Sequence, residues 1–245
     1  MSGKKIVAII PARSGSKRIK HKNVRMVGGH PLIAYTIEHA KRSGIFSQIF
    51  VCTDSQRYAD IAKSYGAIVP ALRPKEISSE HSPDIEWVKW CINEWGLLAY
   101  DALSILRPTS PLRNNKDIKS AWEDFLSQPQ CDSIRAVTKA DIHPGKMWTS
   151  NGRTISPLMP FSINNVPWHS SQTASLPEVF YQNASLEIAW ISQILATGKI
   201  SGDLIKPYFS QGYSGFDINE PADMDFFEFL IQRGIVKIDT PQRVN

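Results

Sequence analysis

Near its amino terminus the chain carries Lys5-Ile6-Val7-Ala8-Ile9-Ile10, an apolar run without polar alternation. This pattern is typical of a parallel strand that is buried on both faces of a sheet. A basic loop follows, because five of the eleven residues from Arg13 to Asn23 are Arg or Lys. Ligands of open parallel sheets bind at the carboxyl ends of the strands. The stretch predicts either a polyphosphate-binding loop or a basic surface loop that happens to follow a strand.

The segments after this loop alternate between helical and strand patterns. Residues 32–43 repeat apolar side chains at helical spacing before Gly44, and residues 48–54 form an apolar strand pattern. A helix that Ser55 caps and a strand over residues 67–72 come next. The order βαβαβ indicates an α/β fold with a parallel sheet and right-handed crossovers.

A second basic loop is expected at the same edge of the sheet. Residues 84–95 have a helical pattern, and the strand predicted over residues 102–106 leads into the loop Arg107-Pro108-Thr109-Ser110-Pro111-Leu112-Arg113. A helix over 116–127 and a strand over 132–137 follow. The two loops together would surround one anionic ligand, because parallel strands end at the same edge.

The regular pattern is interrupted between residues 139 and 178. Pro, Gly and Asn residues divide this segment into short apolar pieces, and Asn151-Gly152 predicts a hairpin turn. A stretch this long is unusual as a plain loop. We expect one domain over residues 1–245, with 139–178 as an insertion that forms part of the active site or a subunit contact. Trp148, Phe161 and Trp168 suit such a contact. Regular structure is expected again at 179–190, 205–209 and 221–233.

The composition indicates a soluble globular protein with a local anionic-ligand site. The chain of 245 residues is 42% hydrophobic and has a net charge of +5, without a long Lys/Arg run that would indicate a nucleic-acid surface. Cys52, Cys91 and Cys131 are too far apart in sequence for a Cys-x-x-Cys pair, which favours free thiols in a reducing compartment. No apolar run approaches the roughly 20 residues that span a bilayer. We therefore expect a cytoplasmic protein that binds neither nucleic acid nor membrane.

Asp217 is the acidic residue that could complement the clustered cations. A carboxylate at a strand end, facing cations, could hold Mg²⁺ that bridges phosphate oxygens. Alternatively, Asp217 or Asn219 could cap the helix that follows. Capping is the favoured interpretation for Asn219, and metal binding for Asp217. The P-loop pattern is absent, and so is Gly-x-Gly-x-x-Gly after the first strand. This argues against a P-loop kinase and against a dinucleotide dehydrogenase.

Three motifs resemble those of the acylneuraminate (sialic acid-type) cytidylyltransferases. They are Ile10 to Asn23, Arg107 to Arg113, and Phe216-Asp217-Ile218-Asn219-x-Pro221-x-Asp223. The resemblance implies a Rossmann-like α/β fold of the nucleotide-diphospho-sugar transferase type, with a mostly parallel sheet flanked by helices. It also implies that the protein uses CTP and Mg²⁺. The expected assembly is a homodimer whose irregular segment reaches into the acceptor site of its neighbour.

The resemblance also implies roles for individual residues. The residues expected at the nucleotide are Arg13, Ser14, Gly15, Ser16, Lys17, Lys22, Asn23, Arg73 and Ser79. Those expected at the sugar acceptor are Arg107, Thr109, Ser110, Tyr181, Gln182 and Asn183. The positions expected at the metal are Asp217 and Asn219. Catalytic roles fall to Arg13, Lys22 and Asp217.

The departures from the family pattern cluster on the acceptor side. Arg107 replaces a common Gln, and Tyr181-Gln182-Asn183-Ala184 replaces Arg-x-Asn-Gly. Lys20 stands where Pro is frequent, and Asn219 where Asp is frequent. The additional guanidinium of Arg107 could bind a carboxylate or an acyl oxygen of the acceptor. Because Asn219 stands in place of an Asp, the site has one carboxylate fewer, and the metal would depend on Asp217 and the substrate phosphates.

The predicted reaction is attack by the 2-hydroxyl of a nonulosonic acid on the α-phosphate of CTP, giving a CMP-sugar and pyrophosphate. Two alternatives stay open. One is the same reaction on an eight-carbon acid of the Kdo type, although the first loop favours the sialic acid branch. The other is a nucleotide-binding homologue without catalysis, which Asn219 favours. Nucleic-acid binding by the basic loop is a further hypothesis and the weakest of all.

Overall fold

The computed structural model describes residues 3–244. These residues form two compact units. The first contains the residues up to Ala136 and from Asn183 onward, and the second is Val137–Gln182. The insertion expected over 139–178 falls inside the second unit, while its contribution to dimerisation stays a prediction.

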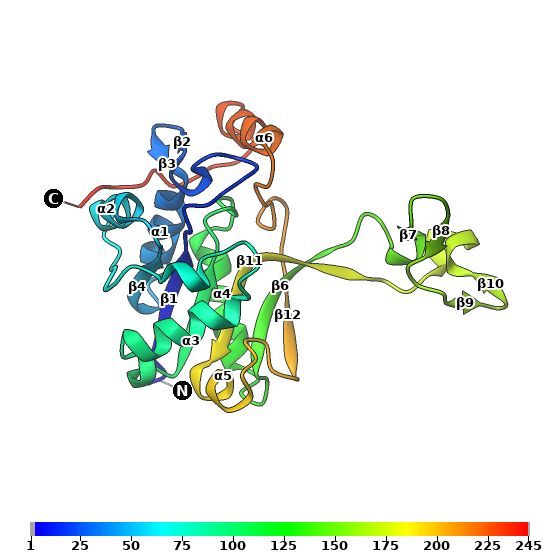
Figure 1. Ribbon diagram of the computed structural model, residues 1–245, viewed down its shortest axis with the longest axis horizontal. Coiled ribbons are helices and arrows are strands. Elements are labelled where there is room, and N and C mark those ends of the chain that lie inside the picture. The colour runs from blue at the N-terminus through cyan, green and yellow to red at the C-terminus, as the bar shows by residue number, and fades with distance from the viewer. Residues whose placement is uncertain (1–2, 245) are drawn as a thin grey trace. The chain divides into compact units, whose positions relative to one another are not determined.

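A six-stranded sheet with strand order β12-β6-β11-β5-β1-β4 forms the centre of the first unit (Figure 1). Its strands are β1 (Ile6–Pro11), β4 (Phe46–Cys52), β5 (Ala102–Leu106), β6 (Ser133–Lys139), β11 (Phe180–Trp190) and β12 (Ile205–Phe209). The α-helices are α1 (Leu32–Ser43), α2 (Gln56–Ser64), α3 (Asp84–Glu94), α4 (Asn115–Leu126), α5 (Ile191–Thr197) and α6 (Pro221–Gln232). A small hairpin is formed by β2 (Met26–Val27) and β3 (His30–Pro31). Within residues 3–244, every helix is too short or too polar to cross a bilayer.

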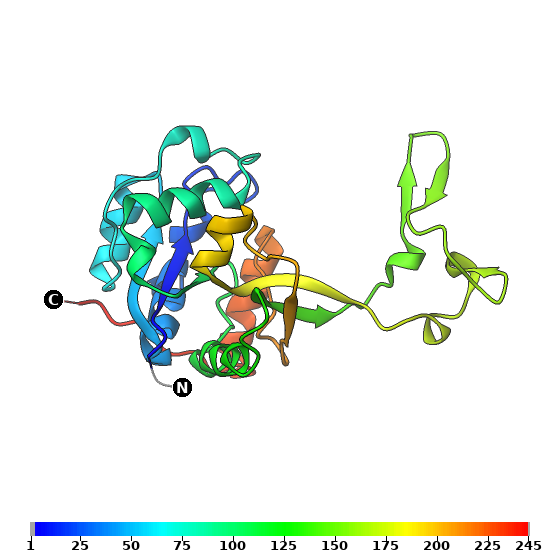
Figure 2. The ribbon, with the colours of Figure 1, turned by 90° about the horizontal axis from the view of Figure 1, so that it is seen from below.

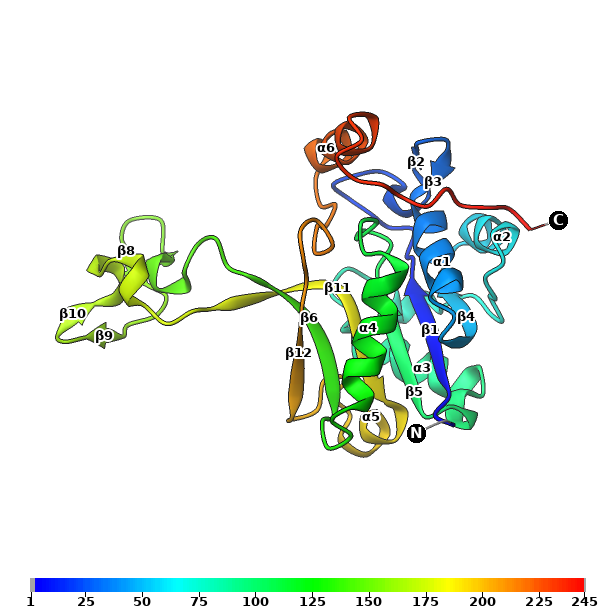
Figure 3. The same cartoon turned by 180° about the vertical axis from the view of Figure 1, so that it is seen from behind.

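Strand β1 lies in the interior of the sheet, since it pairs in parallel with both β4 and β5. Its alternate side chains enter two different cores. Ile6, Ala8 and Ile10 belong to a cluster that includes residues of α1 and α4. Val7 and Ile9 belong to a cluster with residues of α3 and α5. The two helical layers cover opposite faces of the sheet, as Figures 1 and 3 show from opposite sides and Figure 2 shows at 90°.

This arrangement confirms the α/β fold with a mostly parallel sheet flanked by helices. It also explains the continuous apolar sequence of β1, because a strand that is covered on both faces has no side chain in water. The sheet is not parallel throughout: β11 pairs antiparallel with β5, with Leu186 opposite Leu106. The predicted strand over 102–106 and the helix after Pro221 are confirmed.

One strand prediction was wrong, and one helix was missed. Residues 67–72 form no strand, and only Ile68 makes a single parallel bridge, with Phe50. Pro70 has no N–H for a sheet hydrogen bond, which explains why the pairing ends there. The missed helix is α5, a short helix of seven residues directly after β11. Its sequence is too short to show a helical period clearly.

The second unit is a small irregular structure with two short hairpins. Strands β7 (Trp148–Ser150) and β8 (Ile155–Pro157) form the first, which confirms the turn predicted at Asn151-Gly152. The second is formed by β9 (Ser162–Ile163) and β10 (Val166–Pro167). Aromatic rings pack inside the unit, for example Phe161 against Trp168 with a centroid distance of 4.9 Å. A unit of this size buries little apolar surface by itself.

Candidate active site

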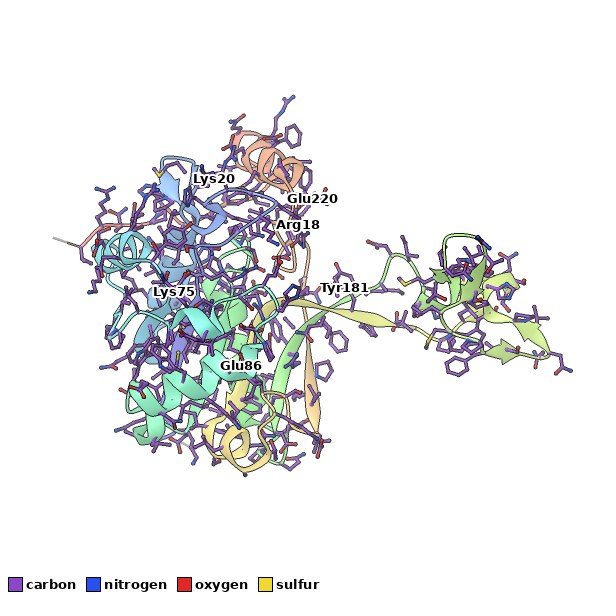
Figure 4. All side chains as sticks on the ribbon, viewed as in Figure 1. Arg18, Lys20, Lys75, Glu86, Tyr181 and Glu220 are labelled. Atoms are coloured by element: carbon purple, nitrogen blue, oxygen red, sulfur yellow. The ribbon has the colours of Figure 1, made fainter. Side chains whose placement is uncertain are left out.

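A pocket of about 610 Å³ lies at the carboxyl ends of β1 and β5 in the first unit. Most of its lining comes from four segments: the loop after β1, the stretch from Arg73 to Trp87, the loop after β5, and the loop before α6; Ala184 of β11 also contributes. Figure 4 labels Arg18 in the first of these and Glu220 at the start of α6. The lining residues with ionisable side chains are Arg13, Lys17, Arg18, Lys22, Arg73, Glu80, His81, Asp84, Arg107 and Asp217. The two basic loops predicted from the sequence therefore reach one cavity.

A third hydrophobic cluster holds these loops together. Ile19 comes from the loop after β1 and Leu112 from the loop after β5, and both pack with Ile218. Met224 and Phe227 of α6 complete the contact. Burial of these apolar side chains brings the three loops together, because each loop contributes one anchor to a shared core.

The first loop is held by hydrogen bonds from outside it. The carboxylate of Asp54 accepts hydrogen bonds from the Ser14 N–H at 2.7 Å and the Ser14 hydroxyl at 2.9 Å. The Asn23 side chain donates to the Arg13 carbonyl at 3.1 Å. The Arg13 guanidinium lines the pocket and donates to the Gly15 carbonyl at 3.3 Å. Arg13 is thus presented to the cavity from a restrained backbone.

Lys22 connects this loop to the loop before α6. Its ammonium donates to the Ile218 carbonyl at 2.7 Å, and the Ile218 N–H donates to the Thr109 carbonyl at 2.8 Å. Burial lowers the pKa of Lys22 from its usual 10.5, and the nearby Asp217 carboxylate acts in the opposite direction. A partly desolvated cation interacts more strongly with an anionic ligand than a fully hydrated one does. The position of Lys22 therefore suits phosphate binding.

Asn219 does not cap helix α6. The N-cap is Glu220, whose side chain forms a reciprocal capping box with Asp223. The favoured capping role of Asn219 was therefore wrong, because Pro221 occupies the first turn and the helix begins there. Instead, the Asn219 amide donates to the Asp217 carboxylate at 2.7 Å. This bond holds Asp217 at the pocket wall.

The residues at Asp217 fit a magnesium ion that also binds substrate oxygens. The Oδ1 atom of Asp217 is buried and has no hydrogen-bond partner among the described residues. Residues 3–244 contain no cluster of three His, Cys, Asp or Glu side chains that could enclose a metal by themselves. Mg²⁺ commonly binds to one or two carboxylates and completes its shell with water and phosphate oxygens. Asp217 offers such a carboxylate, and the Asn219 side chain lies next to it.

The stretch from Arg73 to Ser82 forms a second wall. Arg73 is buried: its N–H donates to the Thr53 carbonyl at 2.8 Å, and its Nε–H donates to the Ser78 hydroxyl at 3.0 Å. The hydroxyl of Ser79 is hydrogen-bonded to that of Ser82 at 2.9 Å. Lys17 of the first loop forms an ion pair with Glu80 of this wall. Two segments far apart in sequence therefore face each other across the cavity.

Arg107 is part of a charge network that the sequence did not reveal. Its guanidinium pairs with Asp84 at the start of α3 and lies 3.8 Å from the Glu187 carboxylate. Glu187 in turn lies 2.9 Å from Arg135. Burial raises the pKa of Glu187, and the two Arg residues act against this shift. Glu187 could have been noticed from the sequence, because it is the one acid within the apolar stretch Leu186 to Ala189. Asp84 could not, because an acid in the first turn of a helix is common.

Several residues expected at the site do not line this pocket. Ser14 and Gly15 lie in the loop but outside the lining, and Ser110 is buried. Asn183 is buried as well: its amide donates to the Ser210 hydroxyl at 2.7 Å, and its side-chain oxygen accepts from the Ser185 N–H. Its neighbour Ala184 lines the pocket instead, with a φ of 58° that favours Gly. Tyr181 and Gln182 belong to the second unit. Their roles stay predictions.

The predicted site residues that do line the pocket come from every wall. They are Arg13, Ser16, Lys17, Lys22, Asn23, Arg73, Ser79, Arg107, Thr109, Asp217 and Asn219. A pocket lined by several cations at the carboxyl edge of a mostly parallel sheet is the arrangement expected of a nucleotide-binding α/β protein. Within that class, the chain belongs to the cytidylyltransferase family, whose family model matches residues 7–142. This match includes the first two of the three motifs, and together with the relatives described next it confirms the resemblance.

Relatives with known names match most of the chain. It is 31% identical to N-acylneuraminate cytidylyltransferase of Escherichia coli over 98% of its own length, although it covers 56% of that protein. It is 30% identical to CMP-N,N'-diacetyllegionaminic acid synthase of Legionella pneumophila, with 93% of this chain and 97% of that protein covered. Pseudaminic acid cytidylyltransferase of Campylobacter jejuni is 39% identical over 55% of this chain and 59% of its own. The chain thus spans little more than half of the length of the E. coli relative.

Solved structures share the fold at low sequence identity. A CMP:2-keto-3-deoxy-manno-octonic acid synthetase complexed with CTP superposes with a TM-score of 0.67 and 14% identity, covering 94% of this chain and all of that one. A 4-diphosphocytidyl-2C-methyl-D-erythritol synthase from Anaerococcus prevotii gives a TM-score of 0.64 at 14% identity, with 94% and 99% covered. At this identity the likeness establishes the fold.

Proposed function

We propose that this protein transfers CMP from CTP to the anomeric hydroxyl of a sialic acid-type nonulosonic acid and releases pyrophosphate. The observation that carries the proposal is the convergence of Arg13, Lys22 and Asp217 in one pocket at the carboxyl edge of the sheet. Membership of the cytidylyltransferase family and the names of the E. coli and L. pneumophila relatives support it. CTP is an intracellular nucleotide, so we place the reaction in the cytoplasm.

The proposed reaction is a single displacement at phosphorus. The 2-hydroxyl oxygen of the acceptor forms a bond to the α-phosphorus, and the bond from this phosphorus to the bridging oxygen breaks. Pyrophosphate leaves with that electron pair, and the acceptor hydroxyl gives its proton to water in the open pocket. Arg13, Lys17 and Lys22 balance the charge that accumulates on the leaving group. Catalysis then rests on positioning and charge stabilisation, without a covalent enzyme intermediate.

Asp217 is the residue that would hold magnesium, with Asn219 restraining it through their hydrogen bond of 2.7 Å. A bound Mg²⁺ would add positive charge at the phosphate oxygens. Lys22 lies close enough to Asp217 for the carboxylate to influence its pKa, so the two side chains bracket the region that we assign to the triphosphate. Arg73 and Ser79, on the opposite wall, are assigned to the cytidine part.

The acceptor half is assigned to Arg107 and Thr109. The Nε–H of Arg107 is buried and has no acceptor among residues 3–244, so it is available to an oxygen of the sugar. The eight-carbon acid named for one solved structure is the alternative acceptor. The carboxylate and ring hydroxyls are common to both acid types, and the substituents on the distal carbons distinguish them.

The direct test is pyrophosphate release from CTP with Mg²⁺ and a panel of acceptors. Sialic, legionaminic, pseudaminic and eight-carbon ulosonic acids would be supplied separately to the purified protein. We expect pyrophosphate release with at least one nine-carbon acid and formation of the corresponding CMP-sugar. CTP binding without turnover on any acceptor would favour the non-catalytic alternative, and turnover on the eight-carbon acid alone would favour the Kdo-type enzyme.

Replacement of Arg13 provides the residue-level test of this proposal. We expect Arg13→Ala to lower turnover by about 100-fold, because a cation at the leaving group is lost. Arg57→Ala is the matched control, since Arg57 is an exposed Arg on α2 and does not line the pocket. Undiminished turnover of Arg13→Ala would refute the triphosphate assignment.

We further infer that the protein is a homodimer formed through the second unit. This unit exposes apolar side chains over its short hairpins, including Trp148, Ile155 and Phe161. Exposed aromatic and aliphatic groups of this kind are enriched in subunit interfaces. In a dimer, the second unit of one chain would complete the acceptor site of its partner.

A further inference from the structure

The peptide unit between Arg13 and Ser14 is held at both of its polar ends. Its carbonyl oxygen accepts a hydrogen bond from the Asn23 side chain at 3.1 Å, and its N–H donates to Asp54 Oδ1 at 2.7 Å. The carbonyl and the N–H belong to one rigid plane. Two bonds on opposite ends of this plane therefore define its rotation, and with it the backbone direction from which the Arg13 side chain leaves.

Asp54 is brought to this position by the sheet. Strands β1 and β4 are parallel and in register at their ends, with Pro11 opposite Cys52, and the Ala12 N–H donates to the Cys52 carbonyl at 2.8 Å. Two residues after the hydrogen-bonded Ala12 and Cys52, Ser14 and Asp54 meet. The second carboxylate oxygen of Asp54 accepts from the Ser14 hydroxyl at 2.9 Å, so both of its oxygens serve the same residue.

The start of the loop would be weakly restrained without this contact. From Ala12 to Lys20 it contains neither helix nor strand, and Gly15 and Lys17 are exposed. Two further bonds at its start are local, from the Ser16 N–H to the Ser14 carbonyl at 3.0 Å and from the Arg13 guanidinium to the Gly15 carbonyl at 3.3 Å. A flexible segment pays conformational entropy when it closes around a ligand, and preorganisation removes part of that cost.

We propose that Asp54 is a positioning residue for the triphosphate, although it does not itself line the pocket. It acts through the Arg13–Ser14 peptide, which it holds together with Asn23 so that the Arg13 guanidinium meets the β- and γ-phosphates. The inference rests on the proposed function, because it assumes that Arg13 contacts these phosphates. It makes Ser14 part of the support of the loop, since both Ser14 donors are engaged with Asp54.

Calorimetric titration of the full chain with CTP, pyrophosphate and CMP tests the proposal without an acceptor. We expect Asp54→Ala to bind CTP and pyrophosphate about tenfold more weakly, which corresponds to the loss of a charge-assisted hydrogen-bond pair. CMP lacks the β- and γ-phosphates, so its affinity should change by less than about twofold. A general structural role would weaken all three ligands alike.

A double-mutant cycle shows whether Asp54 acts through Arg13. In the Arg13→Ala background the side chain to be positioned is missing, so Asp54→Ala should cause no further loss of CTP affinity. An equal loss in both backgrounds would overturn the proposal. Asp54→Asn retains an oxygen for the Ser14 N–H and should fall between the wild type and Asp54→Ala. It also provides the test if Asp54→Ala does not fold.

The controls separate this inference from the proposed function. Asp60→Ala is the matched variant, because Asp60 is an exposed acid on α2 whose hydrogen bond within residues 3–244 is a local one, from Gln56 of the same helix. It should bind all three ligands as the wild type does. A wild-type protein that binds neither CTP nor pyrophosphate would overturn both proposals. A wild type that binds CTP, with an Asp54→Ala variant of equal affinity, would overturn the positioning role alone.

Discussion

At the scale of single residues, the charged side chains of the pocket form two groups. Arg13, Lys22 and Asp217 surround the region that we assign to the triphosphate. Arg107 belongs to the other group, where the carboxylates of Asp84 and Glu187 already oppose its charge. Arg107 is therefore not the free cation that its position after β5 suggested. An acceptor carboxylate would have to share this guanidinium with Asp84.

Removal of the Asp217 carboxylate should weaken the response of turnover to the Mg²⁺ concentration. We expect Asp217→Ala to lose about 100-fold in turnover, because the unpaired Oδ1 is the atom that we assign to the metal. Chelation of divalent cations with EDTA should stop the wild-type reaction, and added Mg²⁺ should restore it. Pyrophosphate release measured against Mg²⁺ concentration checks both. Asp225→Ala on the exposed side of α6 is the control, and a magnesium response of Asp217→Ala like that of the wild type would contradict the assignment.

Loss of the Arg107 charge should destabilise the fold in a pH-dependent way. Arg107→Met leaves Asp84 and Glu187 without their shared cation, and we expect a cost of about 2 kcal/mol at pH 8. The pKa of Glu187 is raised by burial, so this group favours folding below its unfolded pKa and loses that contribution as pH rises. The destabilisation should therefore be smaller at pH 5. Urea unfolding at both pH values measures it, and an equal cost at both would contradict the network.

At the scale of elements, helix α1 combines an apolar face with buried polar side chains. Thr36 accepts a hydrogen bond at 3.2 Å from Arg113, a fully buried residue of the loop after β5. Burial lowers the pKa of Arg113 to about 9. The next turn places His39 in the same interior, with 2% of its surface exposed. Polar groups on α1 thereby tie the helix to the loop that carries Arg107.

The buried histidine of α1 should make stability fall in mild acid. Burial, with a smaller contribution from Arg113, lowers the pKa of His39 to about 3. The unfolded chain takes up a proton near pH 6.5 while the folded chain does not, so stability present above pH 6.5 is lost below it. We expect a loss of about 2 kcal/mol between pH 8 and pH 5 from this group.

Chemical unfolding across this pH range compares the wild type with His39→Gln. The variant cannot titrate at this position, so its stability should decline less steeply between pH 6.5 and pH 5. Parallel declines in the two proteins would show that His39 is not the group responsible. The two proteins share all their other titrating groups, so the difference between their pH dependences of stability comes from position 39.

At the scale of the whole molecule, the two units differ in how they are stabilised. The first has cores on both faces of its sheet and a third core under α6. The second leaves Met147, Ile155, Leu158 and Val166 exposed, along with four aromatic residues, Trp148, Phe161, Phe180 and Tyr181. Exposed apolar side chains that lie together are typical of interaction surfaces. The proposed dimer would cover them.

Introduction of a charge into this apolar surface should affect assembly. We expect Ile155→Asp to shift the protein from dimer to monomer in light scattering after size-exclusion chromatography, because a carboxylate is costly to bury at an interface. Leu98→Asp is the matched control: Leu98 is 66% exposed and lies in the first unit, and Ile155 is 60% exposed. A monomeric wild type, or a dimer unaffected by Ile155→Asp, would contradict the role of the second unit.

Local sequence patterns were sufficient for most elements and for the cations of the site. The continuous apolar run of β1, the apolar strand over 102–106 and the helix after Pro221 each leave a pattern in a short stretch of sequence, and that pattern predicts them. The basic loop after β1 was recognisable for the same reason. The exception over 67–72 shows the limit of this reasoning, because an apolar run becomes a strand only where a partner strand accepts it.

The sequence by itself determined the α/β class, the two basic loops and the cytidylyltransferase resemblance. Tertiary structure alone decided which groups support the loops: Asp54 beneath Ser14, Asp84 and Glu187 around Arg107, and the Lys22 ammonium on the Ile218 carbonyl. The members of these contacts are 23 to 196 residues apart. Strand register and helix packing bring them together, and both depend on the whole core, which no local pattern encodes.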